Sequence, residues 1–219
     1  MQTNDFIRVV YSAKIKETGQ ELDKTGDNPV PVIVKPGFVI KGLEEALLQM
    51  NVNEKKTIEI PPEKAFGARN PKLIRLVPIA EFIKHNTKPQ PGMFVQADRF
   101  RGKVLSVSGG RVKVDFNNPL AGKTLIYDIE IKEKVETVEN KIKVLFEIFT
   151  AADKDKIKIN VKDKEVEIEI PPLVNSLFKK KIADEIINIL NFEKVKYVEV
   201  FEKPKEEDKK PEEKPKTEN

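Results

Sequence analysis

The sequence of 219 residues contains no cysteine and a single histidine, His85. Without cysteine there is no disulfide framework, no thiolate nucleophile and no cysteine metal site. No spacing of His and carboxylate residues resembles a zinc or calcium site, so the sequence predicts no metal ligand. A serine triad would need His85 itself, and no serine lies in a nucleophile elbow. These absences argue against hydrolases and metal-dependent catalysis.

Long apolar runs and phosphate-binding glycine motifs are also missing. Nowhere do about 18 apolar residues follow one another, and the polar residues 1–5 lack the apolar segment of a signal peptide. The glycines never form a phosphate-cradling run after a strand. We therefore predict a soluble, cytoplasmic protein with no membrane partner and no cofactor.

Charge is plentiful but unevenly distributed. The net charge of +4 arises from residues 71–121, which carry nine basic and three acidic residues. Such a basic patch can indicate nucleic acid binding, acidic partners or a merely solvated surface. Only one aromatic residue, Phe100 between Arg99 and Arg101, is interleaved with these basic residues. Because nucleic acids are usually bound by several stacking aromatics, this pattern argues against a nucleic acid partner. Residues 203–219 are nearly all Lys, Glu, Asp and Pro, and we predict a disordered tail there.

Alternating apolar residues predict an antiparallel sheet in two separated parts of the chain. A strand over 6–16 turns at residues 17–20 and returns over 21–24, which places Asp23 near Tyr11. A short helix over 42–48 would pack Leu43 and Leu47 on one face. Further strands are predicted over 31–34, 55–60 and 124–134. Together these segments predict one sheet curved over one short helix.

Two further units follow from the same patterns. Residues 71–121 contain strand-like runs over 93–97, 103–107 and 111–116, the last two joined by Ser108-Gly109-Gly110. The second unit begins near Asn140, with a hairpin around Asp163-Lys164, a helix from about 173 to 190 and a strand over 194–201. The apolar stripe of that helix is broad for so small a unit, so we predict a homodimer formed through it.

The residues expected to face the first sheet's concave side include three aromatics and one acid. On composition alone we would predict that they are core residues, because aromatic side chains that face inward on a small sheet usually belong to the core. Their order and spacing favour a binding site. The motifs in question are Tyr11, Leu22-Asp23, Val39-Ile40-Lys41-Gly42-Leu43-Glu44-Glu45-Ala46-Leu47, Ala65-Phe66-Gly67 and Asn117-Asn118-Pro119-Leu120-Ala121-Gly122-Lys123-Thr124-Leu125-Ile126-Tyr127.

These five ordered motifs resemble the FKBP family of peptidyl-prolyl isomerases, and specifically its SlyD-type branch, in which a chaperone domain is inserted into the catalytic domain. The additional C-terminal unit resembles the long archaeal members. The resemblance implies an α+β fold with an FKBP-like antiparallel half-barrel sheet wrapped on a short helix, an inserted mainly-β domain and a small C-terminal α+β domain. The predicted domains are 1–70 plus 122–138 (catalytic), 71–121 (inserted chaperone domain), 139–202 (C-terminal) and 203–219 (tail).

By the same resemblance the catalytic residues fall on Tyr11, Asp23, Ile40, Phe66 and Tyr127. Substrate-binding residues fall on Leu22, Val39 and Leu43, and in the inserted domain on Phe82, Ile83, Met93 and Phe94. The sequence departs from the family at Leu43, where Trp is common, and at Phe66, where Tyr is common. The His- and Cys-rich metal-binding tail of SlyD is absent as well, so nickel binding is not implied.

Three functions follow from these patterns. The first is a prolyl isomerase that accelerates X-Pro isomerisation in unfolded or partly folded proteins held by the inserted domain. The second is a holdase chaperone with little isomerase activity, and short-peptide isomerisation would separate it from the first. The third is a nucleic-acid-associated protein that uses the basic residues 71–121, which binding across a range of salt concentrations would test.

Overall fold

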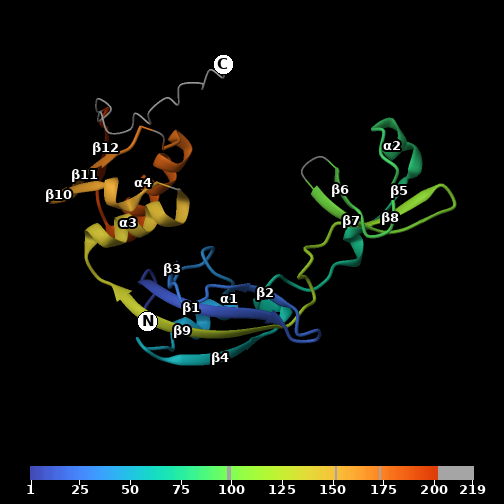
Figure 1. Cartoon of the computed structure of the whole chain (residues 1–219), viewed down its shortest axis with the longest axis horizontal. Helices are drawn as coiled ribbons and strands as arrows, with labels where there is room; N and C mark the ends of the chain where they lie inside the picture. The colour runs from blue at the N-terminus through green and yellow to red at the C-terminus, as the bar shows by residue number, and fades with distance from the viewer. Residues whose placement is uncertain (98–99, 151, 173, 202–219) are drawn as a thin grey trace, which may run out of the picture. The chain divides into compact units, whose positions relative to one another are not determined.

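The computed structural model describes residues 1–97, 100–150, 152–172 and 174–201. The chain divides into two compact units, Met1–Val135 and Glu136–Asn219 (Figure 1). The tail predicted over 203–219 lies outside the described residues. Among the described residues no helix is long and apolar enough to cross a membrane. A cytoplasmic location stays a prediction.

The first unit is built on a five-stranded antiparallel sheet with strand order β2-β1-β9-β4, in which β3 also pairs with β1 (Figure 1). Its strands are β1 (Phe6–Ile15), β2 (Glu21–Lys24), β3 (Val30–Ile33), β4 (Lys55–Ile60) and β9 (Leu125–Val135). The strands predicted from alternation are therefore confirmed to within one residue at each end. Among the five strands of this sheet, β9 comes last in the sequence but lies between β1 and β4 at the centre of the sheet.

The core of this sheet comes from the alternation that the sequence displays. Ile7, Val9 and Ile15 of β1 are buried together with Leu125, Ile129 and Ile131 of β9. Because side chains of a strand alternate between faces, the intervening residues of both strands point outward. The helix α1 (Lys41–Leu47) packs Leu43 and Leu47 into the same cluster. The short helix is thus what the sheet curves over, as predicted.

Close packing of α1 on β4 depends on Gly42. A Cβ atom at this position would lie 2.5 Å from Cγ2 of Ile60, a side chain that is 1% exposed. No other side chain would fit at this distance, because protein interiors are packed without room for an added methyl group. Gly42 therefore fixes how near the helix lies to the sheet.

Residues 71–115 form a four-stranded antiparallel sheet of order β5-β8-β7-β6. The elements of this segment are η2 (Pro71–Leu73), β5 (Ile74–Pro78), α2 (Ile79–Lys84), β6 (Phe94–Ala97), β7 (Phe100–Ser108) and β8 (Arg111–Asp115). The short helix η1 (Pro62–Lys64) precedes the segment in the chain. The hairpin at Ser108-Gly109-Gly110 is confirmed, and both glycines have positive φ. A small core of Val104, Val112 and Val114 holds the sheet together. We refer to these residues as the inserted unit.

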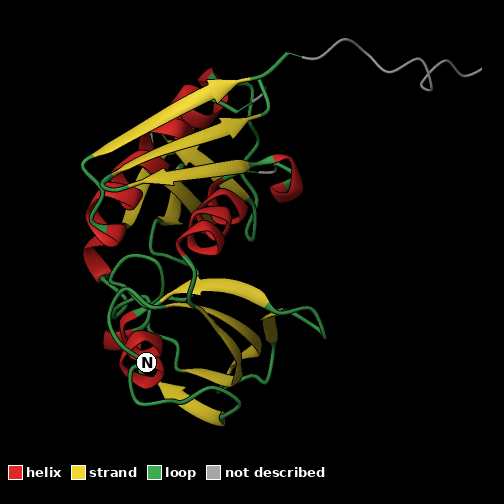
Figure 2. Cartoon of the chain, turned by 90° about the vertical axis from the view of Figure 1, so that its left-hand side faces the viewer, coloured by secondary structure: helices red, strands yellow, loops and turns green. Residues whose placement is uncertain are grey.

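The second compact unit is a three-stranded sheet with two helices (Figure 2). It comprises α3 (Val138–Phe149), η3 (Lys154–Lys156), β10 (Lys158–Lys162), β11 (Glu165–Ile170), α4 (Ser176–Leu190) and β12 (Lys194–Glu199). The hairpin around Asp163-Lys164 is confirmed, since Lys162 pairs with Glu165 and Asp163 has a φ of 47°. β12 pairs with β11 in parallel, and α4 is the connection between them.

Among the described strands and α-helices, three were not predicted from the sequence: β5, α2 and α3. The helix α3 had a readable signal, because Thr137 accepts a hydrogen bond from the backbone N–H of Asn140 and so caps it. Its buried residues Ile142, Leu145 and Phe146 follow helical spacing. The helix α4 begins at Ser176 and not near 173, since Asn175 caps it by accepting from Leu177 N–H at 2.8 Å.

The missed helix α3 changes the interpretation of α4. Ile182 and Ile186 of the predicted apolar stripe are fully buried, and α3 packs against α4. The stripe is therefore covered within the unit over most of its length. Leu177 and Phe178, in the first turn of α4, remain 71% and 41% exposed.

Candidate functional site

A hydrogen bond joins Tyr11 on β1 to Asp23 on the neighbouring strand β2. The Tyr11 hydroxyl donates to Oδ2 of Asp23 at 2.5 Å. The hairpin predicted to bring these residues together is present, with Ala13 opposite Asp23 in the register. Thr25, which sequence reasoning missed, accepts from Tyr11 N–H at 3.0 Å and donates its own N–H to the Tyr11 carbonyl. The backbone of Tyr11 is thereby held where the hairpin ends.

Tyr127 on β9 lies beside Tyr11, with ring centroids 5.9 Å apart and planes tilted by 41°. Burial, followed by the hydrogen bond and negative charge of Asp23, raises the pKa of Tyr11 well above the usual range. Burial and the charge of Asp23 also raise the pKa of Tyr127. Both phenols therefore stay protonated at neutral pH and can donate hydrogen bonds.

Most of the apolar residues predicted for the site pack against the core of the sheet. Leu22, Val39 and Ile40 are half-buried and pack against the core cluster that contains Leu43. Tyr11 and Tyr127 pack against this cluster too. Ile40 immediately precedes α1, so its position follows from where that helix begins. Asp23 is exposed, which places its carboxylate on the solvent side of the cluster.

Among the apolar residues predicted for this site, Phe66 does not join the cluster. It lies in the loop after η1 and is 37% exposed, whereas its neighbour Ala65 packs against the core. The loop is held by Gly67, which donates to the Pro62 carbonyl and accepts from Gly122 N–H at 2.8 Å. The chain thus leaves for the inserted unit and returns from it beside Phe66.

The inserted unit has a cleft of about 580 Å³ that brings together three of its four predicted binding residues. Phe82, Met93 and Phe94 line it, as do His85 and Glu81, which were not predicted. Ile83 is 62% exposed on α2 but is not among the lining residues. We call this the apolar cleft. The adjacent Val77 and Val95 add to its apolar wall.

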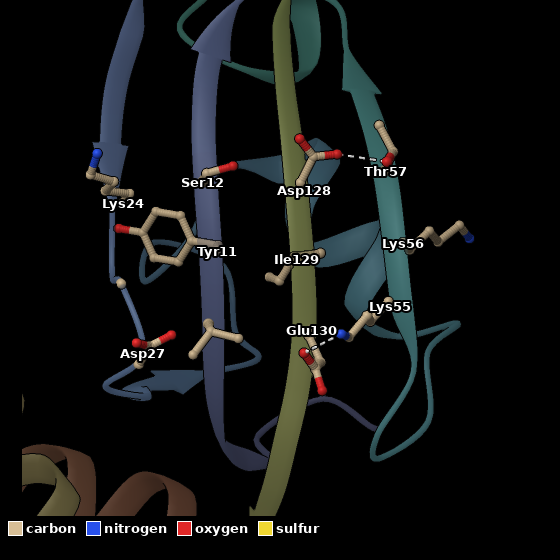
Figure 3. Close-up of a pocket in the computed structure, with 12 residues that line it drawn as sticks. Tyr11, Ser12, Lys24, Asp27, Lys55, Lys56, Thr57, Asp128, Ile129 and Glu130 are labelled. Atoms are coloured by element: carbon tan, nitrogen blue, oxygen red, sulfur yellow. Dashed lines mark hydrogen bonds and ion pairs between the residues drawn. The ribbon is translucent and has the colours of Figure 1, made fainter.

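A further hollow lies on the outer face of the five-stranded sheet, which we call the catalytic sheet because the predicted catalytic residues lie on it or beside it. Figure 3 shows Tyr11 at its edge and two pairs of polar side chains: Thr57 donates to Asp128 at 2.6 Å, and Lys55 lies 3.3 Å from Glu130. The hollow crosses β1, β9 and β4 and has a volume of about 550 Å³. Lys24, Asp27 and Lys56 line it as well, and a wall this rich in charged side chains offers little to an apolar ligand.

The arrangement suits binding and orientation of a polypeptide. Apolar side chains lie beside two phenols and one carboxylate, which can hold an apolar ring next to an amide. No three His, Asp or Glu side chains gather within the described ranges in a way that could hold a metal ion. The catalytic roles of the individual residues stay predictions.

Two family models match the chain outside its catalytic sheet. The model described as "FKBP26, IF domain" matches residues 75–120, and the model described as "FKBP26_C-terminal" matches residues 138–202. The first match coincides closely with the inserted unit. The second covers the elements from α3 to β12.

Curated relatives match about half to two thirds of the chain. The short-type peptidyl-prolyl cis-trans isomerase of Methanocaldococcus jannaschii is 40% identical over 105 residues, 48% of this chain and 67% of the relative. The FKBP-type 16 kDa peptidyl-prolyl cis-trans isomerase of Escherichia coli is 32% identical over 140 residues, 61% of this chain and 93% of the relative. The SlyD isomerase of Helicobacter pylori is 28% identical over 152 residues, 65% and 82% respectively.

Proposed function

Because the chain belongs to the FKBP-type peptidyl-prolyl cis-trans isomerases, we propose that it accelerates X-Pro isomerisation in unfolded or partly folded proteins that its inserted unit holds. The chain is an isomerase of this class, and SlyD-type proteins are among its relatives. The holding of unfolded proteins by the inserted unit is the step that we propose here.

The proposed catalysis needs no covalent chemistry. Rotation about an X-Pro bond faces a barrier of about 18–20 kcal/mol because amide resonance must be lost. The twisted amide is less dipolar than the planar one, so an apolar site disfavours the ground state more than the transition state. Ile40, Leu43 and Phe66 would contact the proline ring, while Tyr11 and Asp23 would orient the adjacent carbonyl. Asp23 then acts through charge and position, since no proton is transferred.

The apolar cleft carries the chaperone part of the proposal. Phe82, Met93 and Phe94 line it, and Met and Phe suit binding to many different sequences. The hydrogen bond between Gly67 and Gly122 anchors both ends of the inserted unit beside Phe66. A protein held in the cleft would keep its prolines near the catalytic residues at an effective concentration that can reach the millimolar range.

Catalysed refolding tests the proposal. We expect substoichiometric amounts of the chain to accelerate refolding of a protein limited by prolyl isomerisation, which otherwise takes tens of seconds or longer. A short proline peptide measured in parallel reports the catalytic site alone. Unchanged refolding together with suppressed aggregation would overturn the proposal in favour of a holdase with little isomerase activity.

We also propose that the second compact unit pairs with another copy of the chain. Leu177 and Phe178 remain exposed at the start of α4, and exposed apolar patches often mark interaction surfaces. This contact would be smaller than the sequence pattern predicted, because α3 covers the rest of the stripe.

A further inference from the structure

The inserted unit borders a second cleft, of about 560 Å³, whose walls are basic. Its lining includes Arg101 and Lys103 of β7 together with Arg69 and Lys123, which flank the inserted unit in sequence. Phe94 and Asp115 line it as well. We call this the basic cleft. It combines side chains from the inserted unit with side chains from the segments that tie the unit to the catalytic sheet.

The positive charge of the basic cleft is not balanced from within. Asp115 is the one carboxylate among the described residues that line it, against four cationic side chains. That carboxylate already pairs with Arg69 and accepts from Asn117 Nδ2 at 2.6 Å. Burial raises the pKa of Asp115, but hydrogen bonds from Asn117 and the charge of Arg69 outweigh burial and lower it. Arg101, Lys103 and Lys123 therefore present a surplus of positive charge to a ligand.

Phe94 connects the basic cleft to the apolar cleft, because its side chain lines both. The ring is 51% exposed and pairs in register with Lys103. The Arg101 guanidinium lies 5.0 Å from the ring centroid and the Lys103 ammonium 5.9 Å from it. One ligand can therefore run from an apolar surface across Phe94 onto a cationic one.

This continuity favours an acidic polypeptide over a nucleic acid. Single-stranded nucleic acids are usually bound by several stacking aromatics along a basic groove. Among the described lining residues of the basic cleft, Phe94 is the one aromatic, and two cations already lie near its ring. An unfolded polypeptide can instead place apolar side chains in one cleft and carboxylates in the other.

We propose that the basic cleft binds Asp and Glu side chains that flank the apolar segment held in the apolar cleft. The inserted unit would thus select apolar segments with acidic neighbours from the proteins on which the enzyme acts. This inference rests on the proposed function, since it requires that the apolar cleft bind unfolded polypeptides.

Fluorescence anisotropy with two labelled, unstructured peptides tests the inference on the full chain. Both peptides carry the same apolar segment, followed in one by a run of Glu and in the other by the same number of Gln. We expect the Glu peptide to bind about tenfold more tightly at low salt, because several exposed ion pairs each contribute modestly. The advantage should shrink as salt rises.

Charge reversal locates the effect. Arg101→Glu combined with Lys103→Glu should remove the advantage of the Glu peptide, whereas Arg111→Glu combined with Lys113→Glu on neighbouring β8 should retain it, since neither residue lines the cleft. The milder pair Arg101→Gln and Lys103→Gln repeats the test in case the charge-reversed variant misfolds. Far-UV circular dichroism checks the folding of all three double variants. Phe94→Ala should weaken binding of both peptides.

The outcomes separate the two proposals. If neither peptide binds, the proposed function of the inserted unit fails and this inference fails with it. If both bind equally, or if the Arg111 and Lys113 variant alone loses the preference, the basic cleft is overturned while capture by the apolar cleft stands. If a single-stranded oligonucleotide displaces the Glu peptide and binds more tightly through Arg101 and Lys103, the ligand is nucleic acid and the inference is overturned.

Discussion

The exposed carboxylate of Asp23 acts on both tyrosines of the site. It accepts from Tyr11 and raises the pKa of both phenols, so it influences the site through its charge. No proton moves when a prolyl bond rotates, and a base is not required. We therefore predict that Asp23 contributes to catalysis by orienting Tyr11 and the substrate.

Replacing Asp23 tests this role directly. We expect Asp23→Ala to slow isomerisation of a short proline peptide about tenfold, which corresponds to the loss of one hydrogen bond of about 1.4 kcal/mol. The melting temperature should hardly change, because the side chain is exposed. Full activity in the variant would exclude the role. Glu21→Ala, an exposed change on the same strand, serves as the control.

The raised pKa of Tyr11 predicts how stability depends on alkaline pH. The folded protein holds the phenolic proton more tightly than the unfolded chain, whose tyrosines titrate near pH 10. This contribution is fully present below about pH 10 and is lost as pH rises toward the folded-state pKa. Urea unfolding should therefore show a smaller alkaline loss of stability for Tyr11→Phe than for the unchanged chain. Identical losses would contradict the assignment.

At the residue scale the sequence sufficed to assemble most of the site. The hairpin between β1 and β2 follows from alternation and a glycine turn, and it brings Asp23 to Tyr11. Thr25 and His85 were not predicted. Thr25 meets Tyr11, and His85 lines the apolar cleft, only once the chain has folded, and no sequence pattern around either residue indicates this. The exposure of Phe66 was not predicted either, since it depends on the loop that the hydrogen bonds of Gly67 and Gly122 hold in place.

At the scale of elements, the regularity of the hydrophobic pattern decided which strands and helices could be predicted. Long alternating strands such as β1 and β9 stand out from their surroundings. β5 and α2 span five and six residues and adjoin at Pro78, so the hydrophobic period changes from that of a strand to that of a helix with no turn between them. The parallel pairing of β12 with β11 agrees with the helix α4 that connects them, since a crossover helix joins parallel strands, but the alternation within β12 alone does not show it.

The β7 strand offers an element-scale test of the inserted unit. A Cβ atom at Gly102 would lie 2.6 Å from Val114 and 2.8 Å from the Phe116 ring. We expect Gly102→Ala to destabilise the inserted unit by about 1–3 kcal/mol through overpacking. Peptide binding in the apolar cleft should weaken, while isomerisation of a short proline peptide should persist.

A matched exposed change controls this experiment. Ser106→Ala lies on the same strand and is exposed, so both readouts should remain unchanged. Should Gly102→Ala reduce short-peptide isomerisation in parallel with cleft binding, the inserted unit and the catalytic sheet would fold as one cooperative body and not separately.

For the whole molecule, the state of association depends on the start of α4. If two copies pair there, Leu177→Glu should convert a dimer into a monomer, because it puts a charge into an apolar contact. Light scattering of the full chain measures the mass. Lys180→Glu changes charge nearby without removing an apolar side chain and should leave the dimer intact. A monomeric mass for the unchanged chain would exclude the pairing.

The central place of β9 in the catalytic sheet has a consequence for biosynthesis. Ribosomes deliver the chain from its N-terminus, so β1 and β4 emerge well before the strand that joins them. The strands β5 to β8 are contiguous in sequence and emerge in between. A nascent copy can therefore complete its inserted unit while its catalytic sheet is still open. It becomes an isomerase only after translation has passed Val135.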